Sequence, residues 1–306
     1  MRFDPENNRM YVRQSWLGDY LLCPQRAKYA LSMPTLRRGS DATAIGTGLH
    51  AVIEQTLRGD VRDVDHMLTN ARAFVSKELD KDIKRTEISR DPDKMMRCVD
   101  SMAIAWWEDI RPYVPEGGLT EYGFKVPLNV NAKNGVEIWL EGTMDYVAPD
   151  GSIWDWKTAS RPYYAREKQT QSHQATCYVT AARTLGIVRP DRPVPFRFGV
   201  MVRQEKPKAQ IITTVRTSDQ SEWLKRQVKS VVDTALDGWG NTDWMMNDQH
   251  NLCSAKWCDY WHLCKGAHWD EFAMTIPEQA VDIRIPSLDD TMMASETPTT
   301  LIGESE

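Results

Sequence analysis

The 306-residue sequence has no long hydrophobic run. No stretch approaches the ~20 consecutive apolar residues that a membrane-spanning helix needs. The opening residues, Met1 to Asp4, do not have the pattern of a signal peptide. The hydrophobic content of 41% and the charged content of 26% are those of a globular protein. We therefore expect a cytoplasmic protein with no membrane partner.

The sequence also lacks an excess of positive charge, since its formal net charge is −5. Most of the negative charge lies in residues 276–306, where seven acidic side chains stand against one arginine, and the rest of the chain is close to neutral. This end has few large apolar residues and is therefore predicted to be an acidic disordered tail. This charge excludes a broad basic face. If the protein binds a polyanion, it must do so in a local groove.

Cysteine is scarce, and its six positions do not suggest disulfides in a reducing compartment. Three of them, Cys253, Cys258 and Cys264, lie within twelve residues, which points to a metal site. A fourth ligand from His262 would make a zinc site, whereas Cys23 would complete a four-cysteine site. The other two, Cys98 and Cys177, lie in predicted helices and are interpreted as core residues.

A predicted β-hairpin carries the chemistry of the sequence. Val136, Ile138 and Leu140 alternate with polar neighbours, residues 149–151, Pro-Asp-Gly, form a turn signal, and residues 153–157 form a short apolar strand. If the turn centres on Asp150, Asp145 and Asp155 stand opposite each other, with Cβ atoms about 5 Å apart. Such an acid pair suits a hard divalent cation, Mg²⁺ or Mn²⁺. Lys157 shares the face of Asp155 and could hold an attacking water.

Periodicity predicts the remaining elements. Helices are expected from Ser15 as N-cap up to Pro24, where the chain restarts, from Ala44 to Leu57, over most of residues 61–114, and over 166–185 and 218–236. Strands are expected at 121–130, 197–203 and 210–216. The 61–114 stretch is predicted to be a helical arm inserted before the sheet.

The hairpin motif resembles that of the PD-(D/E)XK nucleases, in particular the RecB-like exonucleases. The residues that carry this resemblance are Gly142-Thr143-Met144-Asp145, followed by Asp155-Trp156-Lys157. Two further motifs, Gly-x-x-x-His ending at His50 and Gln-x-x-x-Tyr at Gln174 and Tyr178, occur in the family's order. The resemblance implies that His50, Asp145, Asp155 and the main-chain carbonyl of Trp156 bind the metal. It also implies that Gln174 and Tyr178 orient the active site and the substrate.

The cysteines extend the resemblance to the iron–sulfur members of this branch. Cys23 precedes a proline, and Cys258 and Cys264 have the spacing of that group's C-terminal cysteines, whereas Cys253 stands further from Cys258 than is usual. The resemblance implies a 4Fe-4S cluster held by Cys23, Cys253, Cys258 and Cys264, with zinc as the alternative.

The resulting prediction is an α/β, restriction-endonuclease-like fold with a mixed central sheet flanked by helices, an inserted helical arm and an iron–sulfur clasp. One nuclease domain would occupy residues 1–275, with the cysteine region at 250–265. The expected activity is Mg²⁺- or Mn²⁺-dependent exonuclease action on DNA, especially on single-stranded ends, in a bacterial or phage-infected host cell. Candidate protein partners are a second copy of the chain and proteins of recombination or CRISPR adaptation. The rival interpretation is a non-catalytic DNA-binding or adaptor module.

Overall fold

The computed structural model describes residues 1–241 and 243–268, so the tail expected at 276–306 lies outside the described residues. The chain divides into two units, Met1–Tyr260 and Trp261–Glu306. In the second unit the described part contains a 3-10 turn, η5 (Trp261–Leu263), and a short helix, α9 (Lys265–His268). All other elements belong to the first unit, and the expected extent of one domain over residues 1–275 stays a prediction.

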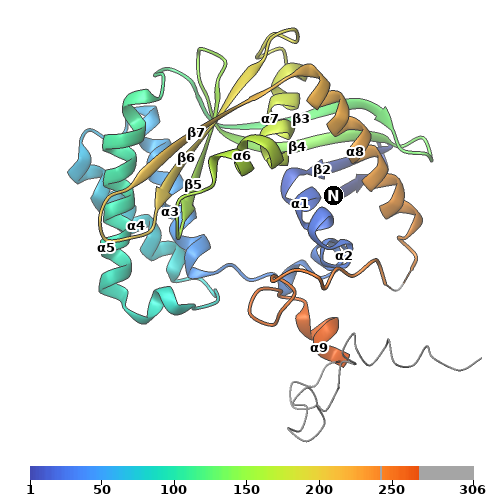
Figure 1. Ribbon diagram of the computed structural model, residues 1–306, viewed down its shortest axis with the longest axis horizontal. Coiled ribbons are helices and arrows are strands. Elements are labelled where there is room, and N and C mark those ends of the chain that lie inside the picture. The colour runs from blue at the N-terminus through green and yellow to red at the C-terminus, as the bar shows by residue number, and fades with distance from the viewer. Residues whose placement is uncertain (242, 269–306) are drawn as a thin grey trace, which may run out of the picture. The chain divides into compact units, whose positions relative to one another are not determined.

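A seven-stranded mixed sheet forms the centre of the first unit (Figure 1). Its strands are β1 (Arg2–Asp4), β2 (Arg9–Arg13), β3 (Leu119–Asn131), β4 (Glu137–Val147), β5 (Ile153–Ala159), β6 (Val194–Val202) and β7 (Ala209–Arg216). They follow the order β1-β2-β4-β5-β6-β7, and β3 also pairs with β4. The β2–β4 and β5–β6 pairs are parallel and the others antiparallel, so the predicted mixed α/β fold is confirmed.

One face of the sheet is covered by helices from both ends of the unit (Figure 1). These are α1 (Gln14–Leu22), α2 (Pro24–Ser32), α7 (His173–Thr184) and α8 (Ser218–Asp237), with the short α6 (Ala165–Gln171) beside β7. Leu17, Val179 and Val228 are fully buried in the core that these helices form with β3–β7. Burial of such side chains stabilises the layer by about 1.5–3 kcal/mol each.

Helix α3 and the two helices of the inserted stretch cover the other face (Figure 1). They are α3 (Asp41–Arg58), α4 (Val64–Leu79) and α5 (Pro92–Ala105). Short turns flank them: η1 (Pro34–Leu36), η2 (Glu87–Arg90), the π-helical η3 (Trp106–Ile110) and η4 (Arg111–Tyr113). Trp106 packs edge-on against Trp156 of β5, with ring centroids 5.8 Å apart. On β6, Gly199 provides the space for Trp156, because a Cβ there would lie 2.7 Å from its ring. This packing fixes the β5 backbone on either side of Trp156.

Asp41, the first residue of α3, is hydrogen-bonded to the inserted stretch. The residue is fully buried, and its carboxylate accepts hydrogen bonds from the main chain and hydroxyl of Thr86 and from the hydroxyl of Ser89. Burial alone would raise the pKa of this carboxyl, but these donors hold it below its usual range. The N-terminal end of α3, which leads to His50, is therefore anchored by charge-assisted bonds.

Several expectations need correction. Ser15 is not an N-cap, because α1 begins at Gln14 and residue 13 precedes it in extended conformation. The helix expected over 166–185 is two helices, α6 and α7, broken at Ser172, whose side chain caps α7 by accepting from Ala175 N. The two N-terminal strands, β1 and β2, were not expected. Across residues 1–241 and 243–268, no helix combines the length and apolarity that membrane crossing requires.

Candidate functional site

The sheet splits at β4, and the split exposes the motif residues. Residues Glu137–Glu141 of β4 pair with β2, whereas only Tyr146 and Val147 pair with β5, opposite Trp154 and Ile153. This register is the one predicted for a turn centred on Asp150. Beyond these two pairs, the Asp145 side chain and not the β4 main chain binds β5. Its Oδ2 accepts a hydrogen bond from the Trp156 N–H at 2.7 Å. The stretch between the two paired segments, 142–145, therefore lies at the fork between β2 and β5.

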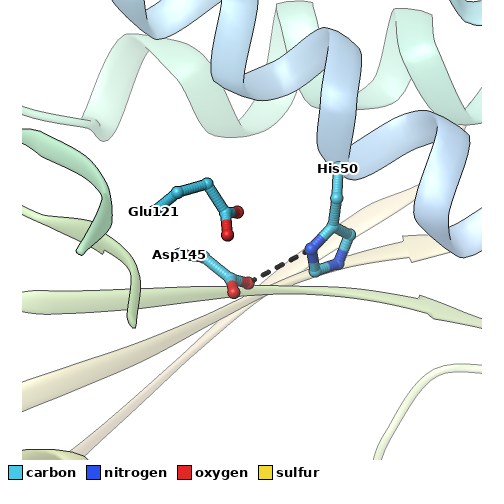
Figure 2. Close-up of side chains that lie close together, drawn as sticks. All are labelled: His50, Glu121 and Asp145. Atoms are coloured by element: carbon cyan, nitrogen blue, oxygen red, sulfur yellow. Dashed lines mark ion pairs between the residues drawn. The ribbon is translucent and has the colours of Figure 1, made fainter. Parts of the chain in front are cut away.

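His50 reaches this fork from α3. That helix begins after Ser40, whose side chain accepts from Thr43 N, and it approaches β5 closely at Gly46, where a Cβ would lie 3.2 Å from Thr158 Oγ1. Figure 2 shows the imidazole of His50 pointing at Asp145, with Nδ1 3.5 Å from Oδ2. Its other nitrogen, Nε2, lies 2.8 Å from the main-chain oxygen of Trp156.

The hydrogen-bond partner of His50 decides which nitrogen could bind a metal. A carbonyl oxygen only accepts, so Nε2 carries the proton and donates to Trp156, which leaves the lone pair of Nδ1 facing Asp145. Burial lowers the pKa of His50, although Asp155 acts in the opposite direction. The imidazole is therefore held neutral, the form in which histidine ligates a metal.

Glu121 is a third member of this group that the sequence did not reveal. It lies on β3 beside Asp145, between the paired positions Thr120–Tyr146 and Tyr122–Met144. One ligand atom each from His50, Glu121 and Asp145 lies within 4.8 Å of the others (Figure 2). The signal that could have identified Glu121 is its position opposite Asp145 in the β3–β4 pair. From the sequence alone, Glu121 was only a polar residue in an alternating strand.

The backbone and the ionisation of Glu121 are both unusual. Its φ is +46°, a left-handed value that costs a non-glycine residue about 1–3 kcal/mol and is often retained at functional sites. Desolvation, together with repulsion from Asp145 and Glu54, raises the pKa of Glu121 to about 7. Burial likewise raises the pKa of Asp145, against the lowering effect of Lys157. Carboxyl groups forced together in this way are relieved by a divalent cation.

Asp155 and Lys157 form the other half of the site, as expected for residues on one face of β5. Asp155 is 1% exposed, and Lys157 Nζ lies 2.5 Å from its Oδ2. Burial raises the pKa of Asp155 to about 6, although the nearby ammonium acts to lower it. Burial would lower the pKa of Lys157, but the carboxylates of Asp155 and Asp145 outweigh it and raise that pKa. The lysine is therefore held as a cation next to both acids.

The Gln-x-x-x-Tyr motif holds Asp155 from α7. Gln174 Nε2 donates to Asp155 Oδ1 at 2.7 Å and lies 3.4 Å from the Tyr178 hydroxyl. Burial raises the pKa of Tyr178 to about 12, so its hydroxyl stays protonated. The same tyrosine lines a pocket of about 660 Å³ together with Arg13, Lys125 and Thr143. The motif thus connects the acid to an open pocket on this side of the fork.

The structure thus brings all six side chains of the predicted site to one fork, but in two groups. His50, Glu121 and Asp145 line a pocket of about 520 Å³ on the α3 side. Asp155 is bound by Gln174 and Lys157, and the Trp156 carbonyl by His50. One imidazole nitrogen and two carboxylates fit Mg²⁺ or Mn²⁺. To bind this metal, Asp155 would have to release Gln174 or Lys157, and the Trp156 carbonyl would have to release His50. Their role as metal ligands therefore stays a prediction.

The predicted cysteine ligands lie in both units. Cys23, Cys253 and Cys258 belong to the first unit, and Cys264 belongs to the second. Burial raises the pKa of Cys258, and Cys23 lies near enough to add to this effect. Such proximity fits two thiols that share a metal. Cys98 and Cys177 are buried in α5 and α7, as expected for core residues.

Comparisons with known proteins agree with this fold. A model of the PD-(D/E)XK nuclease superfamily matches residues 14–265. The crystal structure of a provisionally assigned exonuclease from Eubacterium rectale is similar at 14% identity and a TM-score of 0.50, covering 83% of this chain and 92% of that chain. The structure of SSO0001 has 10% identity and a TM-score of 0.36, and the match covers 86% of this chain and 88% of that one. No curated protein matches the sequence.

Proposed function

Since the chain belongs to the PD-(D/E)XK nuclease superfamily, we propose that it is a metal-dependent DNA exonuclease that hydrolyses phosphodiester bonds at single-stranded ends. The observation that carries the proposal is the pairing of two groups at one fork: His50, Glu121 and Asp145 within 4.8 Å of one another, and an ion pair between the buried Asp155 and the partly buried Lys157 beside them. A binding module has no need for a lysine held beside two largely buried acids.

The nucleases of this superfamily use divalent metals. In this chain His50 Nδ1, Glu121 and Asp145 would hold Mg²⁺ or Mn²⁺, and the family resemblance adds Asp155 and the carbonyl of Trp156. Once bound, the cation supplies positive charge for the phosphate oxygens and lowers the pKa of a bound water. Burial raises the pKa of both Glu121 and Asp145, and repulsion from Asp145 and Glu54 raises that of Glu121 further, so a bound cation would favour the ionised form of both carboxyl groups.

The chain's own groups carry the remaining roles. The Lys157 ammonium, whose pKa stays high, would orient the attacking water and stabilise the negative charge that develops on the phosphate oxygens. Gln174 fixes the Asp155 carboxylate that holds this ammonium. The water oxygen becomes part of the new terminal phosphate as the bond to the leaving sugar oxygen breaks, and a water proton ends on that oxygen.

The finer assignments rest on the same resemblance. Cys23, Cys253, Cys258 and Cys264 would hold a 4Fe-4S cluster, with zinc as the alternative, and the proximity of Cys23 and Cys258 supports a shared site. The reaction would serve recombination and repair or CRISPR spacer processing. The protein would then act with further copies of itself or with the proteins of those pathways.

Degradation of end-labelled single-stranded DNA tests the proposal. The purified chain with Mn²⁺ or Mg²⁺ should release short products from a linear strand, whereas a circular strand of the same sequence should persist and a chelator should stop the reaction. Cleavage of the circle at the same rate would replace exonuclease action with endonuclease action. Tight DNA binding without cleavage in either metal would favour the non-catalytic adaptor instead.

A further inference from the structure

Another cavity opens where β5 ends, only a few residues beyond Lys157. It has a volume of about 370 Å³ and is lined by the connection from Ala159 to Tyr164 and by two residues of α6, Glu167 and Lys168. Neither the metal group nor the Gln-x-x-x-Tyr motif contributes to this lining. The cavity therefore requires an explanation of its own.

Tyr163 connects this cavity to the reaction centre. Its main chain is clamped by the side chain of Gln210 on β7, which accepts from the Tyr163 N–H at 3.0 Å and donates to its carbonyl at 3.1 Å. The Tyr163 hydroxyl group lies within electrostatic range of both Lys157 and Asp155. The lining begins at Ala159, the last residue of β5 and two residues beyond Lys157, so a ligand in the cavity would lie at the end of the strand that carries the lysine assigned to the attacked phosphate.

The lining combines aromatic and cationic side chains. Tyr164 is 77% exposed, more than any other large hydrophobic residue in the described parts of the chain. Lys168 Nζ lies 4.4 Å from the centroid of the Tyr163 ring, so that ring is covered by a cation while the ring of Tyr164 is open to solvent. Arg161 is an exposed residue of the lining, and Glu167 is its acidic residue. Cations thus outnumber anions around an accessible aromatic ring.

We propose that this cavity binds an unpaired nucleotide next to the scissile phosphate, with a base stacked on Tyr164 and the backbone phosphates on Arg161 and Lys168. Single-stranded nucleic acid is held by this combination of a stacking ring and a positively charged track. A base within a duplex has both faces covered by its neighbours, so Tyr164 selects for single strands. The inference rests on the proposed nuclease function and specifies its substrate.

Binding measured without turnover separates the two proposals. Fluorescence anisotropy of the full chain, in buffer without divalent cations, compares a single-stranded oligonucleotide with an abasic strand of equal length and charge. Tyr164→Ala should weaken binding of the base-containing strand roughly 5- to 150-fold, which is the range expected for loss of one stacked base. The same variant should bind the abasic strand as the parent chain does, and Tyr164→Phe should retain both affinities.

Tyr113 provides a matched control. It is 68% exposed at η4, on the inserted part of the chain, so Tyr113→Ala removes a ring of similar accessibility and should change neither affinity. Equal effects of the two alanine variants, or equal loss of the abasic strand with Tyr164→Ala, would overturn the stacking site. Failure of the parent chain to cleave DNA with Mn²⁺ would instead overturn the nuclease proposal, because the binding measurement involves no cleavage.

Discussion

The imidazole of His50 and the main-chain oxygen of Trp156 are 2.8 Å apart, although the two residues are separated by 106 positions. This contact joins α3 to β5 between the two residues, Asp155 and Lys157, that face α7. It fixes the proton on Nε2 and turns Nδ1 toward Asp145, so the orientation of the imidazole depends on the β5 backbone. The Trp156 ring, packed on Trp106, in turn holds that backbone in place.

Removal of Asp145 should abolish metal binding and cleavage together. Asp145 shares the metal group with His50 and Glu121 and also accepts from the Trp156 N–H, so no other carboxylate can replace it. We expect Asp145→Ala to show no saturable Mn²⁺ binding by calorimetry and no cleavage, with a cooperative unfolding transition. Glu116→Ala, which removes an exposed carboxylate elsewhere, is the control. Parent-like activity of Asp145→Ala would exclude this acid from the site.

Glu121 should strengthen metal binding rather than define it. Its carboxylate belongs to the metal group, and burial and repulsion raise its pKa to about 7. Glu121→Gln should weaken Mn²⁺ affinity by about 10- to 100-fold, the range seen when a supporting group of a metal site is removed. Glu54→Gln is a control in the same pocket, because Glu54 pairs with Arg58 and lies outside the group. Equal affinities of the two variants would place Glu121 outside the metal site.

Lys157 should affect turnover and leave the metal in place. The ammonium contacts Asp155 and is assigned to charge that develops only during the reaction, so Lys157→Ala should lower kcat by about 100- to 1,000-fold. Mn²⁺ affinity, measured by calorimetry, should stay within a few-fold of the parent value. A collapse of metal affinity would instead make Lys157 a structural counter-charge for the two carboxylates.

The contribution of Asp155 to the stability of the metal-free protein should fall as pH rises from about 4 to 6. Burial raises the pKa of Asp155 to about 6, so over this range the unfolded chain releases a proton that the folded chain still retains. The group's stabilising contribution is complete below its unfolded pKa and is lost as pH rises through its folded pKa.

The matched measurement is urea unfolding of the parent and of Asp155→Asn with chelator at several pH values. The parent should lose free energy of unfolding relative to the variant, by about 3 kcal/mol at most for a shift of two pH units. Parallel pH profiles would show that Asp155 is ionised in the fold at pH 4 and that the Lys157 ion pair dominates its environment.

Local patterns predicted the hairpin well and the surroundings of the site poorly. The turn at Pro149–Gly151 set the register, because index counting holds as long as two strands pair directly. Index counting could not show that the Asp145 side chain replaces the main chain as the partner of Trp156 N. This replacement turns Asp145 toward α3, whereas Asp155 faces α7. Glu121 was missed for a similar reason, since its position depends on a backbone conformation with positive φ and on a strand pairing across 24 residues.

The cysteine site gives the last prediction. Cys23 interacts with Cys258 across 235 positions of the chain, so a metal or cluster shared by both would close a very long loop. Such a tie restricts the unfolded chain, and the estimated effect for long loops is on the order of 4 kcal/mol. Cys23→Ala should therefore lose iron and acid-labile sulfide after anaerobic purification, with lower solubility, and cleavage should fall as a consequence. Cys98→Ala, at a buried cysteine of α5, should retain the parent content. One zinc per chain without sulfide, unchanged in Cys23→Ala, would establish a local zinc site on Cys253, Cys258 and Cys264 instead.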